Sequence, residues 1–431
     1  MSKSVLVVGF MLFAIFFGAG NLIFPPKLGL DSGTEFWSAI SGFVITGVGL
    51  PLLGIIVAAF YEGGYKQILN RIHPWFSIAF LMAIYLAIGP FFAGPRTGAT
   101  AYEIAILPFL SEPSALSLFI FSLIYFAIAL WLSLNPSKMV DRIGAVLTPI
   151  LLIAIIVLVV KAYFLLTGDT VVLTNKPVME SAFSKGILEG YFTMDALASL
   201  AFSVIVLNAI KAKVTNHSAL VKQTILSGLV AAVALALIYI SLGWIGNNLP
   251  MNAETLADLT AKGQNIGTYI LNTAATETFG DAGRIMLGVI VSLACLTTTV
   301  GLAVAVSEYF HEIFPKISYK TYVVLFIVIS FAIANQGLSA VISKSVPVLL
   351  VLYPISMTVI LLLLINLVFK LPLLAQRLAI ALVTIVSILS VIGIEAVANL
   401  PFKEYSMEWL PFAIVGCVVG YIIAKAAKHA E

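Results

Sequence analysis

Four polar segments interrupt the long apolar runs of this sequence, and they carry the residues that could bind or react there. The first is Gly18-Ala19-Gly20-Asn21, which lies in an apolar run from 5 to 24 and precedes Pro25-Pro26. Glycine in a helix centre costs about 1 kcal/mol relative to alanine, so this segment predicts a helix that comes apart. Bare carbonyls bind cations, and the ends of half-helices bind the charged groups of small substrates. Close packing of two helices through Gly-x-Gly is the alternative.

The second segment surrounds Asp195, the one acidic residue that we place well inside an apolar run. A carboxylate is costly in the hydrocarbon region of a membrane, so it normally faces a partner or a cavity. Thr193 and Ser199 flank it, and the small residues around it permit a helix break. The alternative is an aspartate at the membrane interface that caps a short helix.

The third segment, Thr297-Thr298-Thr299, offers hydroxyl oxygens, which suit a hard cation such as Na⁺. A threonine hydroxyl can instead bond back to a carbonyl one turn earlier, which buries it without any function.

The fourth segment holds Pro90, Pro95 and Arg96. Because proline in a helix interior removes a hydrogen bond and kinks the chain, we place these residues at the outer end of a helix. An arginine at the membrane interface explains Arg96 there as well as a substrate contact does.

The composition places this chain in a lipid bilayer. Of its 431 residues, 61% are hydrophobic and 10% are charged, whereas soluble domains carry about 25% charged residues. No glycine-rich phosphate loop with a following lysine is present, which argues against an ATP-driven pump. The histidines and the two cysteines show no metal-ligand spacing, and the net charge of +3 includes no basic tract for nucleic acid. Nothing in the sequence sets an oligomeric state.

We predict an all-α polytopic membrane protein with twelve membrane-spanning helices, or spans. The first and the sixth spans are expected to be broken. The predicted limits are 5–26, 36–60, 76–95, 115–133, 143–166, 191–210, 221–246, 283–306, 321–334, 346–369, 377–395 and 409–427.

Charge sets the expected orientation. When alternate loops are assigned to opposite sides, most of the 23 Lys and Arg residues fall on one side. Cytoplasmic loops carry the excess of these residues, so we expect this side, which includes both termini, to be cytoplasmic. The longest external loops are then 161–190 and 247–282, and both are long enough to hold short helices on the outer face.

The two expected breaks are five spans apart, which indicates an internal repeat. An odd number of spans repeated once must be inverted in the membrane, and matching broken helices in two inverted halves point to a transporter site near the midplane. We therefore divide the chain into a first five-helix repeat (1–168), a second five-helix repeat with external loops (169–370), and two extra helices with a cytoplasmic tail (371–431).

Three blocks of sequence, in order along the chain, resemble the bacterial branched-chain amino-acid:cation symporter family of the amino-acid/polyamine/organocation superfamily. The resemblance implies the leucine-transporter fold, in which helices 1 and 6 unwind around an amino acid and a sodium ion lies between helix 1 and helix 8. It also implies a bacterial inner-membrane location. The blocks are Phe13-Ala14-Ile15-Phe16-Phe17-Gly18-Ala19-Gly20-Asn21-Leu22-Ile23-Phe24-Pro25-Pro26, Gly89-Pro90-Phe91-Phe92-Ala93-Gly94-Pro95-Arg96-Thr97 and Tyr191-Phe192-Thr193-Met194-Asp195-Ala196-Leu197-Ala198.

On this chain the resemblance implies a substrate site at the two breaks, where Gly18 and Gly20 would meet the substrate carboxylate. Residues 193–199 would hold the amino group and the side chain, although Asp195 has no counterpart in the general pattern of the fold. The implied substrate-site residues are Phe16, Gly18, Ala19, Gly20, Asn21, Thr193, Asp195, Leu197 and Ser199. The implied sodium-site groups are the carbonyls of Ala14 and Phe17 and the hydroxyls of Thr298 and Thr299.

The sequence and this resemblance together predict a secondary symporter, not an enzyme, that imports leucine, isoleucine and valine with Na⁺ by alternating access. Na⁺-independent relatives of this fold often carry a lysine within helix 5, and none lies between Gly144 and Val160 here. H⁺ is the alternative coupling ion and would use Asp195. Another small solute, such as alanine or a nucleobase, is the alternative substrate for the same fold.

Overall fold

The computed structural model describes residues 3–61, 63–110, 114–134, 138–168, 179, 181–211, 214 and 216–429. Within these residues almost every regular element is a helix, including two π-helical turns and two 3₁₀ turns. In chain order the helices are α1 (Lys3–Phe16), α2 (Ala19–Ser32), α3 (Phe36–Val44), η1 (Ile45–Gly49), α4 (Leu50–Phe60), α5 (Gly64–Ile72), α6 (Pro74–Leu86), η2 (Ala87–Phe91), α7 (Ala93–Ala105), η3 (Leu107–Phe109), α8 (Ala115–Leu134), α9 (Lys138–Gly168), α10 (Ala182–Tyr191), α11 (Asp195–Lys211), α12 (His217–Asn248), α13 (Ala253–Ala261), α14 (Ile266–Ile313), α15 (Tyr319–Ala334), α16 (Leu338–Val368), α17 (Leu373–Ile392), α18 (Glu395–Ala398), η4 (Lys403–Tyr405) and α19 (Leu410–His429).

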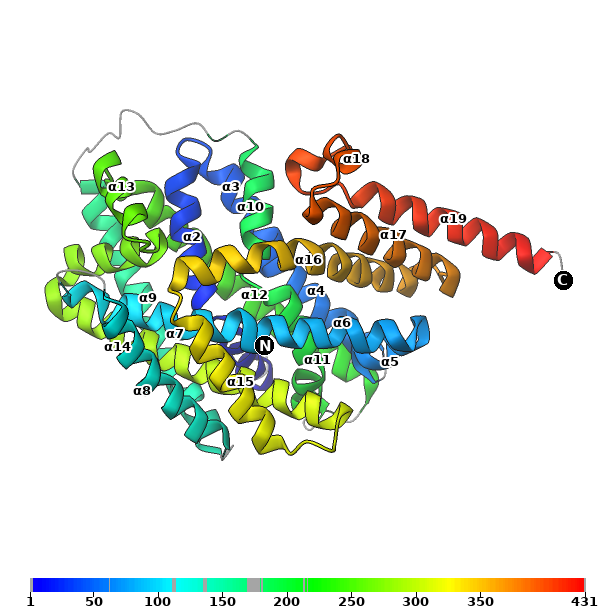
Figure 1. Cartoon of the computed structure of the whole chain (residues 1–431), viewed down its shortest axis with the longest axis horizontal. Helices are drawn as coiled ribbons and strands as arrows, with labels where there is room; N and C mark the ends of the chain where they lie inside the picture. The colour runs from blue at the N-terminus through cyan, green and yellow to red at the C-terminus, as the bar shows by residue number, and fades with distance from the viewer. Residues whose placement is uncertain are drawn as a thin grey trace.

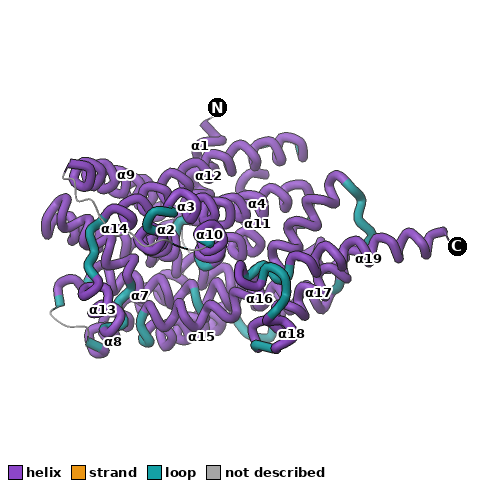
Figure 2. The backbone as a smooth tube through the Cα atoms, turned by 90° about the horizontal axis from the view of Figure 1, so that it is seen from above, coloured by secondary structure: helices purple, strands orange, loops and turns teal. Residues whose placement is uncertain are grey.

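The helices form an elongated bundle. Figure 1 shows α8, α9 and α14 toward one end of the long axis and α17, α18 and α19 at the other, and Figure 2 shows the same arrangement from above. The C-terminal helix α19 extends away from the bundle in both views. The last two apolar helices therefore lie at the margin of the molecule, away from the broken first span.

The described helices support ten membrane-spanning helices, or eleven when the bent first pair is counted as one span. In the part of the chain that the structure describes, ten helices are long and apolar enough to cross a membrane. The helices α1 and α2 form a further unit of this kind, bent by 73° at the break between them, and α15 is a shorter apolar helix. This confirms a multi-pass, all-helical membrane protein.

Several helices extend beyond the predicted limits. The sixth span begins with α10 at Ala182 rather than at 191. The predicted external loop 247–282 contains α13 and the first part of α14, which leaves helical geometry at Gly280, where φ is 63°. Short helices were expected in this loop, and the structure confirms them. In the other predicted loop, residues 169–178 lie outside the described residues.

The placement of Pro90, Pro95 and Arg96 at the end of the third span is wrong. This span continues through α6, η2 and α7 as one apolar stretch, Pro74–Phe109. The π-helical turn η2 accommodates Pro90, and Pro95 lies in the first turn of α7, where a helix needs no amide donor. Arg96 is therefore buried inside the protein, with 4% of its surface exposed, and does not lie at the interface.

Backbones approach closely where α2 packs against α12 and α14. A Cβ added to Gly246 would lie 1.9 Å from the carbonyl oxygen of Pro26, and one added to Gly267 would lie 2.0 Å from that of Ile23. Helices in a bilayer gain little by burying apolar surface against each other, so small residues that permit close packing hold them together. These contacts hold the second half of the broken first span between two neighbouring helices.

Replacing Gly246 with alanine should destabilise the protein, because the added methyl group would overlap the Pro26 carbonyl; overpacking of this kind costs about 1–3 kcal/mol. Gly301 is the matched control, since it is also helical and nothing lies within 4 Å of an added Cβ. Gly301→Ala should leave the melting temperature in detergent unchanged or raise it. Equal melting temperatures for the two variants would contradict the close contact between α2 and α12.

Candidate functional site

The first break lies at Phe17 and Gly18, between the end of α1 and the start of α2. Gly18 is extended, with φ −118° and ψ −166°, and its amide donates to Oδ1 of Asn21 at 3.0 Å. In a continuous helix that amide would donate to the carbonyl of Ala14. The break therefore separates the Ala14 carbonyl from its helical partner, and Phe17, which lies outside both helices, adds a second backbone carbonyl nearby.

The second break covers residues 192–194, between Tyr191 at the end of α10 and Asp195 at the start of α11. Met194 has a φ of 71°, a left-handed conformation that residues other than glycine rarely adopt. Such strain persists where surrounding contacts hold it and is common at binding sites. Both expected breaks, in the first and in the sixth span, are thus present.

Asn21 connects the two breaks. Its Nδ2 donates to Oδ2 of Asp195 at 2.5 Å and also to the hydroxyl of Tyr239 on α12. The Tyr239 hydroxyl in turn donates to the same Asp195 oxygen at 3.4 Å. All three side chains are buried, so neutral protein donors take the place of water around the carboxylate. One side chain thus ties the first, sixth and seventh spans together.

Arg96 binds the backbone carbonyls that the second break exposes. Its Nη1 donates to the carbonyl of Phe192 at 2.6 Å, and its Nη2 donates to that of Thr193 at 2.8 Å. The C-terminal end of a helix carries partial negative charge, and the planar guanidinium group suits two neighbouring oxygen acceptors. Arg96 therefore satisfies the end of α10 from the third span, within electrostatic range of Asp195.

The guanidinium group of Arg96 also borders the first turn of α2. A Cβ added to Gly20 would lie 2.7 Å from Nη2 of Arg96, and the guanidinium carbon lies 5.4 Å from the centre of the Phe24 ring. Only glycine fits at position 20 without moving this group. Asp195, bound to Asn21, and Arg96, beside Gly20, therefore place one negative and one positive group next to the N-terminus of α2.

The threonine run of α14 divides into two groups. The hydroxyls of Thr297 and Thr298 both donate to the carbonyl of Ala294, at 2.8 Å and 3.1 Å. The methyl group of Thr298 would lie 3.8 Å from a Cβ added to Gly18. Thr298 therefore lies beside the first break, with its methyl group next to Gly18.

Thr299 faces other helices. Its hydroxyl bonds to the hydroxyls of Thr97 at 2.5 Å and Tyr125 at 2.8 Å, and it also donates to the carbonyl of Cys295 at 2.9 Å. These partners lie on the third and fourth spans and on α14 itself. Thr298 and Thr297 thus share one acceptor, whereas Thr299, the second threonine predicted for the sodium site, has other partners.

The remaining predicted site residues differ in their placement. Phe16 and Ala19 are buried on the two sides of the first break, and Leu197 is completely buried in α11. The Thr193 hydroxyl donates to the carbonyl of Gly190 at 2.9 Å. Ser199 packs against the second span, because its hydroxyl would lie 2.0 Å from a Cβ added to Gly54. The structure therefore does not bring Ser199 to the breaks.

Asp195 was predicted to be the one acidic residue well inside a span, and this prediction is wrong. Glu103 of α7 is also buried, and it accepts hydrogen bonds from the hydroxyl of Thr268 at 2.6 Å and the amide of Asn265 at 3.0 Å. The predicted third span ended at 95 and so excluded this residue. Because Glu103 binds the N-terminus of α14, where a negative charge is favourable, it has a structural role.

Tyr239 and the inward position of Arg96 were not predicted from the sequence. Tyr239 lies in an apolar helix, and no neighbouring residue distinguishes it. Arg96 did carry a signal, because an arginine inside an apolar stretch normally needs an internal partner. Among the described residues no group of three or more His, Cys, Asp or Glu side chains could hold a metal ion. A cation at the first break would therefore depend on carbonyl and hydroxyl oxygens.

Broken helices around buried charged groups point to a transporter site near the middle of the membrane, and solved structures share this fold. The inward-facing structure of Mhp1 aligns with 97% of this chain over 90% of the Mhp1 chain, with a TM-score of 0.62 at 14% identity. A closed structure of Mhp1, described as a nucleobase-cation-symport-1 family transporter with bromovinylhydantoin bound, matches 99% and 93%, with a TM-score of 0.57 at 16% identity. The expected leucine-transporter fold is confirmed.

Sequence comparison assigns the family. The family described as branched-chain amino acid transport protein matches residues 1–427, and this chain belongs to it. A Staphylococcus aureus protein named as a branched-chain amino acid carrier is 52% identical over 439 residues, covering 100% of this chain and 98% of the relative. A Staphylococcus haemolyticus protein of the same description is 53% identical over 435 residues, covering 99% and 97%.

Exchanging the two polar groups at the centre of the site should test the bond between Asn21 and Asp195. Asn21→Asp alone places two carboxyl groups against each other, and an uncompensated buried charge costs about 3–5 kcal/mol, so branched-chain amino acid uptake should fall by more than about tenfold. The double variant Asn21→Asp with Asp195→Asn keeps one donor and one acceptor and should recover much of the stability.

The measurements for this exchange are thermal unfolding of the purified variants and uptake after reconstitution. Additive losses in the double variant would mean that the two side chains do not interact. Asp195→Asn alone is the second single variant of the cycle, and it sets two amide groups against each other.

Proposed function

We propose that this transporter carries leucine, isoleucine and valine inward together with Na⁺, by alternating access. The observation that supports this most directly is the convergence of Asp195, Arg96 and the N-terminus of α2 at one place. They offer one negative and one positive region, which is what a zwitterionic amino acid requires. The relatives named as branched-chain amino acid carriers support the choice of substrate.

In this proposal the two ends of the substrate bind different groups. The carboxylate binds the amides at the start of α2, at Gly18, where it replaces the Asn21 side chain as acceptor, and at Gly20, and it is attracted by Arg96. The carbonyls of Phe192 and Thr193 already accept from Arg96, so Asp195 is the acceptor for the substrate ammonium. Since Asp195 is also bound by neighbours, the ammonium would replace part of an existing network.

The proposed Na⁺ site lies between α1 and α14. Carbonyl and hydroxyl oxygens suit a hard cation, and the C-terminal end of α1 favours positive charge. Thr298 stays in the site because it lies beside Gly18, whereas Thr299 has a structural role because its hydroxyl is shared with Thr97. The proposed ligands are the carbonyls of Ala14, Phe17 and Ala294 and the hydroxyls of Thr297 and Thr298.

An apolar pocket would select the substrate side chain. Phe16 and Leu197, both buried near the breaks, are its proposed walls, together with a residue of the third span. An apolar pocket distinguishes side chains that differ by one methylene by only about 1–3 kcal/mol. One carrier would therefore accept all three branched-chain amino acids and reject the shorter alanine side chain more strongly.

The proposed topology has twelve spans in the bacterial inner membrane, with both termini in the cytoplasm. It comprises two inverted five-helix repeats, 1–168 and 169–370, each beginning with a broken span. The unit 371–431 stands outside the repeats, which agrees with the close contact of α19 with α17 through Gly416 and Gly420 and with its place at the end of the bundle (Figure 1).

Uptake of radiolabelled leucine into liposomes with imposed ion gradients tests the proposal. An inward Na⁺ gradient should drive accumulation, and a proton gradient alone should not. Unlabelled isoleucine and valine should compete at similar concentrations, whereas alanine and uracil should compete at least about tenfold more weakly. If leucine neither accumulates nor exchanges, the substrate assignment fails. Accumulation driven by protons instead of Na⁺ would assign the coupling to Asp195.

Single threonine substitutions test the ion site. Thr298→Ala and Thr297→Ala should each raise the Na⁺ concentration needed for half-maximal uptake by about tenfold, because each removes one oxygen ligand. Thr299→Ala is the control: it should lower thermal stability and leave this Na⁺ concentration unchanged. If Thr299→Ala raises this Na⁺ concentration and Thr297→Ala does not, the ion site contains Thr298 and Thr299, the pair predicted from the sequence.

A further inference from the structure

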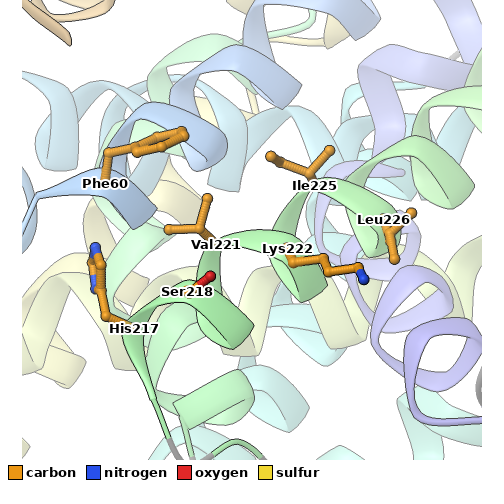
Figure 3. Close-up of a pocket in the computed structure, with 7 residues that line it drawn as sticks. All are labelled: Phe60, His217, Ser218, Val221, Lys222, Ile225 and Leu226. Atoms are coloured by element: carbon orange, nitrogen blue, oxygen red, sulfur yellow. The ribbon is translucent and has the colours of Figure 1, made fainter.

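A groove of about 390 Å³ lies between the end of α4 and the first turns of α12. Phe60 forms one side of it, and a single face of α12 forms the rest. Figure 3 shows Phe60 and His217 at one end of the shared space and Ile225 and Leu226 toward the other. The α12 residues that line it are His217, Ser218, Val221, Lys222, Ile225 and Leu226. We refer to these residues and Phe60 as the Lys222 groove.

The polar end of the Lys222 groove carries positive charge. Within the part of the chain that the structure describes, the side chains of Lys222 and His217 show no hydrogen-bond or ion-pair partner. A neighbouring hollow of about 100 Å³ shares His217 and adds Lys211. The N-terminus of α12, with Ser218 in its first turn, adds the partial positive charge of a long helix. A small anionic group therefore fits this end.

The other end of the groove continues into an apolar stripe along α12. Beyond Leu226, the outward-facing residues Leu229, Val233 and Leu237 are 48%, 58% and 61% exposed. Their spacing of four residues keeps them on the same face of the helix as Lys222. Lys222 and Val233 are eleven residues apart, about 17 Å along the helix axis, close to the ~15 Å thickness of one hydrocarbon leaflet.

We infer that the Lys222 groove binds an anionic phospholipid. The headgroup phosphate lies against Lys222, His217 and Ser218, and one acyl chain follows Leu226, Leu229 and Val233 toward the bilayer centre. The basic residues belong to the loop and helix start that the charge distribution assigns to the cytoplasmic side, where basic pockets between membrane helices bind anionic headgroups. This inference does not depend on which solute is transported.

A lipid fits these observations better than a free anion or a peptide. Free phosphate would use the charged end and leave the apolar part of the groove and the stripe unexplained. An acidic peptide would need a polar path along the helix, whereas the residues beyond Lys222 are Ile225, Leu226 and Leu229. A site for an anion and an apolar stripe of about one leaflet in length together match a phospholipid.

Native mass spectrometry of the purified full-length protein tests the inference. The probe is palmitoyl-oleoyl phosphatidylglycerol, compared with the zwitterionic palmitoyl-oleoyl phosphatidylcholine. Phosphatidylglycerol should bind more tightly, and Lys222→Gln should weaken its binding by about fivefold, the effect of removing one charge near a membrane surface. Lys320→Gln is the matched control, because Lys320 is an exposed lysine in the first turn of α15 and lines neither of these hollows. It should change binding by less than about twofold.

Two further experiments distinguish a phospholipid from a free anion. Leu226→Gln should also weaken phosphatidylglycerol binding, and neither inorganic phosphate nor soluble glycerophosphoglycerol should compete with the lipid. Competition by either one would overturn the inference in favour of a free anion. Three other outcomes would also overturn it. The two lipids could bind equally, or Lys320→Gln could have as large an effect as Lys222→Gln. A dimer could also form in place of the bound lipid. Elution of every variant as a single folded species with the wild-type melting temperature excludes misfolding as the cause.

Discussion

Hydrocarbon offers no hydrogen bonds to the backbone, and the centre of this molecule is organised by that constraint. A helix that breaks inside a membrane releases peptide groups that must find partners within the protein. The Gly18 amide finds the side chain of Asn21, and the carbonyls of Phe192 and Thr193 find Arg96. Because Asn21 also reaches Asp195, and Arg96 belongs to the third span, satisfying the two breaks ties the first, third and sixth spans to one another.

If the proposed substrate site is correct, the same bonds allow a closed network to admit a substrate. A hydrogen bond to a charged group is worth about 1.5–3 kcal/mol net, whereas leaving a buried charged group unpaired costs more. A zwitterion that replaces Asn21 or Tyr239 at Asp195 exchanges one bond for another, so its net cost is small. An apolar solute would displace the same bonds and return none, and an uncharged polar solute would return weaker bonds than an ammonium group does. The network would thus favour zwitterions before any apolar pocket acts on the side chain, which complements the weak discrimination that apolar pockets achieve.

The fold and both breaks could be predicted because their causes are local in sequence: apolar runs long enough to span a bilayer, and glycines that weaken a helix. The partners could not be predicted in this way, because Asn21 and Tyr239 are 218 positions apart and only the packing of α2 against α12 brings them together. The end of the third span was misplaced for a different reason. Proline stops a helix in its interior but not in its first turn, and the π-helical turn before Pro95, which creates a new first turn, leaves no mark in the residue pattern.

The threonine run shows how helix rotation gives adjacent residues different neighbours. Successive residues of a helix point about 100° apart, so three adjacent threonines must face different neighbours: Thr298 faces the first break, and Thr299 faces Thr97. Thr97 follows Arg96 directly on α7, and Arg96 holds the second break. Two consecutive residues of the third span therefore connect α14, beside the first break, to the end of α10. The third span therefore contacts both α14, beside the first break, and the carbonyls of the second break.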